Sequence, residues 1–212
     1  MTSAVHPDTT FDQTRLPLVL RRAVVLGAIE AACVLFFSLA SRFLAGGPET
    51  AVRALIVLAG LTAVTLLPGT WIRPRTIEGI AGAAGLGLAA AVVFLIIDVI
   101  ALQPTGTYTN RWLEIGGGSN WWYHPVWWMA GTFLPWMGAF CMANQRARSG
   151  EASPPAVMGL SLGLAIVLGL GATLIGFPGA SIGLGTFAVA FLPALALAAL
   201  ITGGGGRRGP RG

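Results

Sequence analysis

The chain has 212 residues, of which 55% are hydrophobic and only 10% charged, whereas a typical soluble domain carries about 25% charged residues. All 13 basic residues are Arg, so the chain lacks the Lys that a P-loop or a Schiff-base cofactor requires. Two Cys without a CxxC spacing predict neither a disulfide framework nor a metal site, and the net charge of +5 does not indicate nucleic-acid binding, because the Arg stand beside apolar segments.

Six apolar stretches are long enough to cross a hydrocarbon layer of about 30 Å. They predict an all-α, polytopic bundle of six transmembrane helices within residues 15–202, between flexible tails at 1–14 and 203–212. We place the helices near 23–45, 54–72, 79–102, 125–143, 155–176 and 182–201. The first is too long for a signal-peptide core and carries charged residues, so we interpret it as a retained span.

The Arg residues predict the orientation. With a cytoplasmic N-terminus, ten of the 13 Arg lie on the cytoplasmic side and only Arg42, Arg53 and Arg111 lie on or near the other side. This bias fits the positive-inside rule. We therefore expect both termini in the cytoplasm and the loop 103–124 outside. The Arg, Ala and Gly bias favours a bacterial protein of the inner (plasma) membrane.

The first and third of these segments have a recognisable inner face at about 100° per residue. In segment 23–45 the polar and small residues share one arc, opposite Phe36, Leu39 and Phe43; they are Gly27, Glu30, Cys33, Ser38 and Ser41. In segment 79–102 the small residues share a face with Asp98; they are Ala83, Ala84, Gly87, Ala90 and Ala91. We expect both faces, and Gly159 with Gly163 in the fifth segment, to be packing seams between helices.

Three charged residues lie inside the predicted spans. Glu30 lies about 10 Å from the cytoplasmic end of its segment. It is either a proton or cation site or a neutral acid hydrogen-bonded to a Thr, such as Thr62 or Thr65, or to a backbone carbonyl. Asp98 and Arg42 lie at similar depth near the outer ends of their segments. A pair between them would either lock two helices together or bind a substrate.

The most distinctive stretch is SNWWYHPVWWM at 119–129. Trp and Tyr gather at membrane interfaces because their rings are apolar and their N–H or O–H groups seek water. An aromatic pocket for a flat, apolar or cationic ligand is the alternative. The candidate ligand-binding residues are Asn120, Trp121, Trp122, Tyr123, His124, Trp127, Trp128 and Trp136.

Helix-end signals stand at Thr76 with Glu78, at Ser153-Pro154, at the turn Phe177-Pro178-Gly179, and at Ser181, which we expect to cap the last helix. Ser161 and Ser181 each sit in a GxSxG pattern, which marks the nucleophile of α/β-hydrolases. Because the chain contains 30 Gly, matches to GxSxG are expected by chance. A triad of Ser181, His124 and Asp98 at the outer surface is nevertheless an alternative.

Taken together, the sequence favours a non-catalytic membrane protein. We expect it to bind a membrane-protein partner or a small amphipathic or aromatic molecule at its outer face. The binding hypothesis includes a role as accessory subunit of a larger membrane complex. Ion-coupled transport through Glu30 and intramembrane serine hydrolysis through Ser181 and His124 are the alternatives. No cofactor is indicated.

Overall fold

The computed structural model describes residues 15–108 and 123–204, with the side chains of 123–125 left out. Within these ranges the chain forms helices and turns and no strand. The helices are α1 (Leu16–Phe43), α2 (Gly46–Ile72), α3 (Ile77–Ile97) with the π-helical turn η1 (Asp98–Leu102), α5 (Tyr123–Ser149), α6 (Pro154–Leu174) and α7 (Leu184–Gly204).

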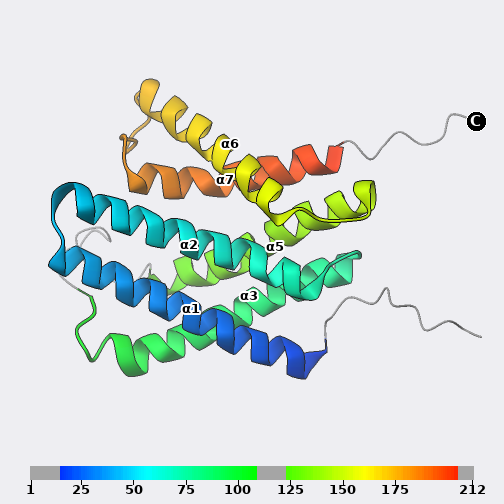
Figure 1. Cartoon of the computed structure of the whole chain (residues 1–212), viewed down its shortest axis with the longest axis horizontal. Coiled ribbons are helices and arrows are strands. Elements are labelled where there is room, and N and C mark those ends of the chain that lie inside the picture. The colour runs from blue at the N-terminus through cyan, green and yellow to red at the C-terminus, as the bar shows by residue number, and fades with distance from the viewer. Residues whose placement is uncertain (1–14, 109–122, 205–212) are drawn as a thin grey trace, which may run out of the picture.

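The long helices lie alongside one another, roughly horizontal in Figure 1, and consecutive helices run in opposite directions. Helix α3 lies between α1 and α5, and α2 contacts both α1 and α5, so these four helices form one group. Helices α6 and α7 form a hairpin that packs on this group mainly through α7 against α5. The start of α1 and the end of α7 lie on the same side of the molecule, at the right of Figure 1.

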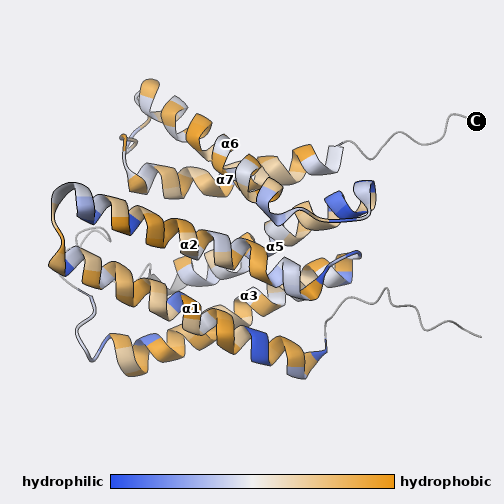
Figure 2. Ribbon diagram, in the orientation of Figure 1, coloured by the Kyte–Doolittle hydropathy of each residue, from blue (hydrophilic) through white to orange (hydrophobic). Residues whose placement is uncertain are grey.

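Five helices in the described ranges are long and apolar enough to cross a membrane: Leu16–Phe43, Gly46–Ile72, Ile77–Leu102, Pro154–Leu174 and Leu184–Gly204. The chain is therefore built as a multi-pass membrane protein. Helix α5 is not among these five; three Trp, two Gly, a Thr and a Pro interrupt its apolar stretch between Val126 and Ala143. Figure 2 shows apolar residues along the helices and hydrophilic residues where α5 joins α6 and where α2 joins α3.

Several helices are longer than the hydropathy of the sequence predicts. Helix α1 begins at Leu16, with Pro17 in its first turn, where proline's missing N–H costs no hydrogen bond. Arg21 and Arg22 are therefore helical rather than flanking. Helix α2 begins at Gly46 and carries Glu49 in its first turn, where a carboxylate is stabilised by the helix dipole. The first turns of α1 and α2 contain polar residues, so both helices begin before the apolar stretches from which they were predicted.

The predicted inner faces of α1 and α3 are confirmed. Gly27 of α1 lies against α3 so closely that a Cβ atom there would be 2.7 Å from the carbonyl oxygen of Ala90. A Cβ on Gly87 of α3 would overlap the backbone of Gly131 in α5, and one on Gly138 of α5 would overlap the carbonyl of Thr65 in α2. Glycine thus permits close helix contact at all three interfaces.

The predicted seam at Gly159 and Gly163 of α6 is wrong. A Cβ at either position would meet no atom within 4 Å, because this face of α6 is not covered by another described helix. The hairpin instead closes through Gly169, whose added Cβ would lie 3.8 Å from Ala190 and Thr186 of α7. Small residues permit close packing but do not by themselves select the face that packs.

The helix caps follow the predicted signals in two of three places. Thr76 accepts a hydrogen bond from the N–H of Gly79 at 3.2 Å, and Ser153 accepts one from Ala156 at 3.4 Å. The turn at Phe177 closes with a 2.9 Å bond from the N–H of Ala180. Ser181 is not the cap of α7, because that helix begins only at Leu184; its N–H donates to the hydroxyl of Thr186 at 3.0 Å.

Arginines hold together the side of the bundle that contains the start of α1. Arg22 of α1 donates to the carbonyl of Trp71 in the last turn of α2 at 2.8 Å, and Arg146 of α5 donates to that of Pro74 at 3.2 Å. Arg148 reaches the carbonyl of Ile201 in α7 at 3.4 Å. Trp71 lies in the last turn of α2, where carbonyls lack a partner within the helix, so Arg22 satisfies one of them.

Candidate functional site

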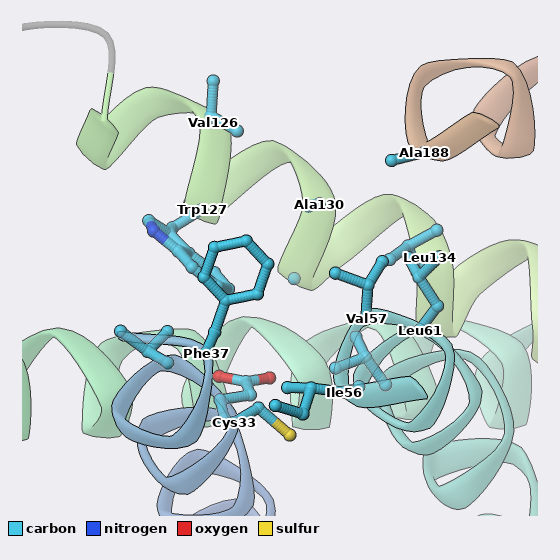
Figure 3. Close-up of a pocket in the computed structure, with 15 residues that line it drawn as sticks. Cys33, Phe37, Ile56, Val57, Leu61, Val126, Trp127, Ala130, Leu134 and Ala188 are labelled. Atoms are coloured by element: carbon cyan, nitrogen blue, oxygen red, sulfur yellow. The ribbon is translucent and has the colours of Figure 1, made fainter. Parts of the chain in front are cut away.

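A pocket opens between α1, α2 and α5, with Ala188 of α7 at its far edge (Figure 3). Its volume is about 380 Å³, within the range of small-molecule sites. Its walls are almost wholly apolar: side chains of Val57, Leu61 and Leu134 face Phe37 and Trp127 across it. Glu30 is the one carboxylate among the residues that line it.

Glu30 lies near the middle of the 28-residue helix α1, about 20 Å from either end at 1.5 Å per residue. The expected distance of about 10 Å from the start of the helix is thus too short, because α1 begins earlier than its apolar stretch. The residue is 4% exposed, and its Oε2 has no hydrogen-bond partner. A buried polar atom in this state costs about 1–3 kcal/mol.

The expected bond from Glu30 to a threonine of α2 does not form. The hydroxyl of Thr62 donates to the carbonyl of Leu58 at 2.7 Å, within its own helix. The hydroxyl of Thr65 is buried and, like Oε2 of Glu30, has no partner. Instead α2 contributes only side chains without a hydrogen-bonding group to the pocket, among them Val64 and Val57.

Aromatic rings close the end of the pocket near Trp127. Trp127 lies 4.4 Å from the ring centre of Phe94 in α3, with the two planes tilted by 44°. Phe37 of α1 faces the same end (Figure 3), and the guanidinium of Arg53 lies 4.6 Å from its ring centre. Arg53 also pairs with Glu49 at 3.1 Å. The charge of Arg53 is therefore balanced within α2.

Asp98 and Arg42 do not pair with each other in the structure. Asp98 is fully buried and accepts hydrogen bonds from Nε2 of Gln103, at 2.6 Å, and from the hydroxyl of Tyr108. Arg42 donates to the carbonyl of Gly106. The η1 segment continues α3 to Leu102, and the residues that follow it bring Gln103 and Tyr108 to Asp98. Both charges tie down the segment after α3, which Ser38 of α1 also binds at Thr107.

The predicted aromatic cluster divides in the structure. Trp127 lines the pocket, whereas Trp128 and Trp136 are 45% and 46% exposed on the outside of α5. These two suit the interfacial or lipid-facing role that aromatic rings often have. Tyr123 and His124 lie in the first turn of α5. Asn120, Trp121 and Trp122 fall outside the described residues, as do the side chains of Tyr123 and His124.

The two GxSxG serines do not assemble a nucleophilic site with Asp98. Ser161 is fully buried and donates to the carbonyl of Val157 in its own helix. Ser181 lies in the connection between α6 and α7, at the opposite edge of the bundle from the end of α3 that carries Asp98 (Figure 1). Among the described residues no group of three or more His, Cys, Asp or Glu is arranged to hold a metal ion.

Sequence reasoning found Glu30 and Trp127 but missed the contribution of α2 to the pocket. Ile56, Val57, Gly60, Leu61 and Val64 recur at helical spacing and form one wall. The only signal for this wall is Gly60 within an otherwise bulky apolar run. Comparison of the chain with protein-family models, with curated proteins and with solved structures finds no match. The candidate site therefore has to be interpreted from its own chemistry.

Proposed function

We propose that the chain is a six-span membrane protein, with both termini cytoplasmic, that binds a small amphipathic molecule in the pocket between α1, α2 and α5. Helix α5 has 27 residues and packs against α2, α3 and α7, which supports counting it as the sixth span. The Arg bias supports the orientation and, with the overall composition, a bacterial inner membrane.

The observation that carries the binding proposal is the combination of an apolar pocket with one buried acid that lacks a full set of partners. Protein interiors are packed about as densely as organic crystals and contain few voids larger than a water molecule. A retained cavity of about 380 Å³ that has one carboxylate among its lining residues is typical of a ligand site. The Trp127 end of the pocket lies near the outer face in the proposed orientation.

Photolabelling tests this proposal. A diazirine-bearing phenylalkanol, added to the protein in lipid nanodiscs, should label pocket residues of α1, α2 and α5 in peptide mass maps. Ala130→Phe fills the pocket, because Ala130 lines it, and should abolish this labelling. Val167→Phe adds the same ring to a side chain that is 66% exposed on α6 and should leave the labelling intact. Labelling that is equal in all three proteins contradicts the proposal.

Ion-coupled transport is a second candidate, favoured by the mid-helix depth of Glu30 and its unpartnered oxygen. Intramembrane acids commonly bind the coupling proton or cation. In proteoliposomes, Glu30→Gln should then abolish substrate-driven proton movement while the protein stays folded. Proton movement that persists in Glu30→Gln removes this candidate.

A partner-protein role has weaker support, from the uncovered glycine face of α6 around Gly159 and Gly163. Small residues on a lipid-facing helix allow another helix to approach closely. A stoichiometric partner retained after gentle detergent extraction, and lost when Gly159 is replaced by Phe, would support the accessory-subunit role. A monomer without companions would count against it.

A further inference from the structure

We infer that the ligand of the pocket is a lipophilic amine, bound as its ammonium ion, whose N–H groups donate to Glu30 and whose apolar body lies against Phe37 and Trp127. This inference rests on the proposed binding function and names the chemistry of the occupant.

The first argument is the hydrogen-bond requirement of the acid. Glu30 is 96% buried, as its 4% exposure implies, and its Oε2 has no donor. Other lining residues that carry a side-chain donor are Cys33, a weak S–H donor, and Trp127, whose indole packs against Phe94 at the far end. The occupant therefore has to bring the donor, and an ammonium group brings up to three.

The second argument is the charge balance of the pocket. No cationic side chain is among the residues that line it, so an ionised Glu30 has no counter-ion there. A paired charge is far better tolerated than a lone one in such surroundings. An ammonium ion supplies the missing charge. An amine that enters as the free base takes the proton of a neutral Glu30, and the same ion pair results.

The third argument concerns the rest of the ligand. Apart from Glu30 the lining offers hydrocarbon, aromatic rings and one thiol, so the body of the ligand has to be apolar. At the aromatic end the face of Phe37 already lies 4.6 Å from the guanidinium of Arg53, so the ammonium group is placed at Glu30 and the apolar body at the rings. An anionic ligand meets Glu30 as a like charge, and a pure hydrocarbon leaves its oxygen without a donor.

A set of four compounds with one shared body tests this chemistry: phenylbutylamine, phenylbutanol, butylbenzene and phenylbutyrate. Each is titrated against the full-length protein in nanodiscs, with displacement of the photoprobe described above as the readout. We expect the amine to displace the probe at least about tenfold better than the alcohol or the hydrocarbon, as one charge-assisted hydrogen bond provides. Phenylbutyrate should bind most weakly.

Variants of Glu30 then locate the preference. Glu30→Gln keeps the shape and removes the charge, so it should reduce the advantage of the amine about tenfold while the affinity for butylbenzene is kept. Glu30→Asp keeps the charge on a shorter side chain and should retain part of the advantage. Glu151→Gln, which removes a carboxylate from the exposed connection before α6, is the matched control and should behave like the wild type.

The outcomes separate this inference from the proposed function. If all four compounds displace the probe equally and Glu30→Gln changes nothing, while Ala130→Phe still abolishes binding, the pocket binds ligands but the amine inference is wrong. If phenylbutyrate binds best, the inference is overturned and Arg53 becomes the charged contact to examine. If Ala130→Phe has no effect on any compound, the proposed function fails as well.

Discussion

Two buried acids in this protein should respond to the same substitution with opposite signs. Glu30 has an oxygen without a donor, whereas Asp98 accepts bonds from Gln103 and Tyr108. Replacing Glu30 by Leu removes an unsatisfied polar atom and its penalty of about 1–3 kcal/mol. We therefore expect Glu30→Leu to raise the free energy of unfolding by about that amount and to abolish amine binding.

Asp98→Leu should lower the free energy of unfolding. Gln103 is exposed and regains a hydrogen bond from water, so only the half-buried Tyr108 loses a partner. Removing a buried hydrogen-bond partner costs about 1–3 kcal/mol, and we expect a loss of that size. Pocket binding should change little, because Asp98 is not among the residues that line the pocket.

Reversible unfolding in mixed micelles, with increasing dodecyl sulfate and helix content as the readout, measures both changes. Glu30→Leu and Asp98→Leu are compared with the wild type and with Glu151→Leu, an exposed acid. If Glu30→Leu unfolds more easily than the wild type, Oε2 has a partner in the membrane. The view of Glu30 as an acid kept for a ligand at the expense of stability would then be wrong.

Three further predictions concern the bundle itself. Gly138→Ala should lower the unfolding free energy by about 1–3 kcal/mol through overpacking against α2. Gly159→Ala, whose added Cβ meets no atom within 4 Å, should leave the unfolding free energy within about 0.5 kcal/mol of the wild-type value. Equal effects of the two substitutions would contradict the packing assignment. In a variant without native cysteines, Glu151→Cys should react with a membrane-impermeant maleimide only from the cytoplasmic side and Thr105→Cys only from the outside, and the reverse pattern would refute the orientation. Ser38→Ala should speed proteolysis of the segment after α3, because it releases the carbonyl of Thr107; unchanged cleavage would assign no role to this bond.

Five of the spans and the inner faces of α1 and α3 could be predicted because membrane helices have a strong hydropathy signal and a fixed rotation per residue. Gly27 and Glu30 share an arc of α1, and the structure buries both. Helix starts were harder to predict. Helix α1 begins at Leu16, before Arg21 and Arg22 and before the long apolar stretch that follows them. A hydropathy profile does not identify a helical turn that contains two arginines.

The candidate site could be predicted only in part. Trp127 and Glu30 were recognisable as unusual residues, but no pattern in the sequence indicates that they share one pocket. Their shared position depends on how α5 is rotated about its axis, which the close approaches of α5 to Gly87 of α3 and, at Gly138, to α2 determine. Asp98 and Arg42 illustrate the same limit: equal depth suggested a pair, yet nearer backbone and side-chain partners in the following segment bind each of them.

The arginines near the start of α1 affect how orientation can be studied in the laboratory. Arg22, Arg146 and Arg148 each close onto a main-chain carbonyl of another helix or its flanking turn. Deleting them to invert the protein in the bilayer would also loosen contacts between neighbouring helices, so a misfolded product could be mistaken for an inverted one. Adding arginines to the connections on the opposite side would alter the charge balance and leave those contacts whole.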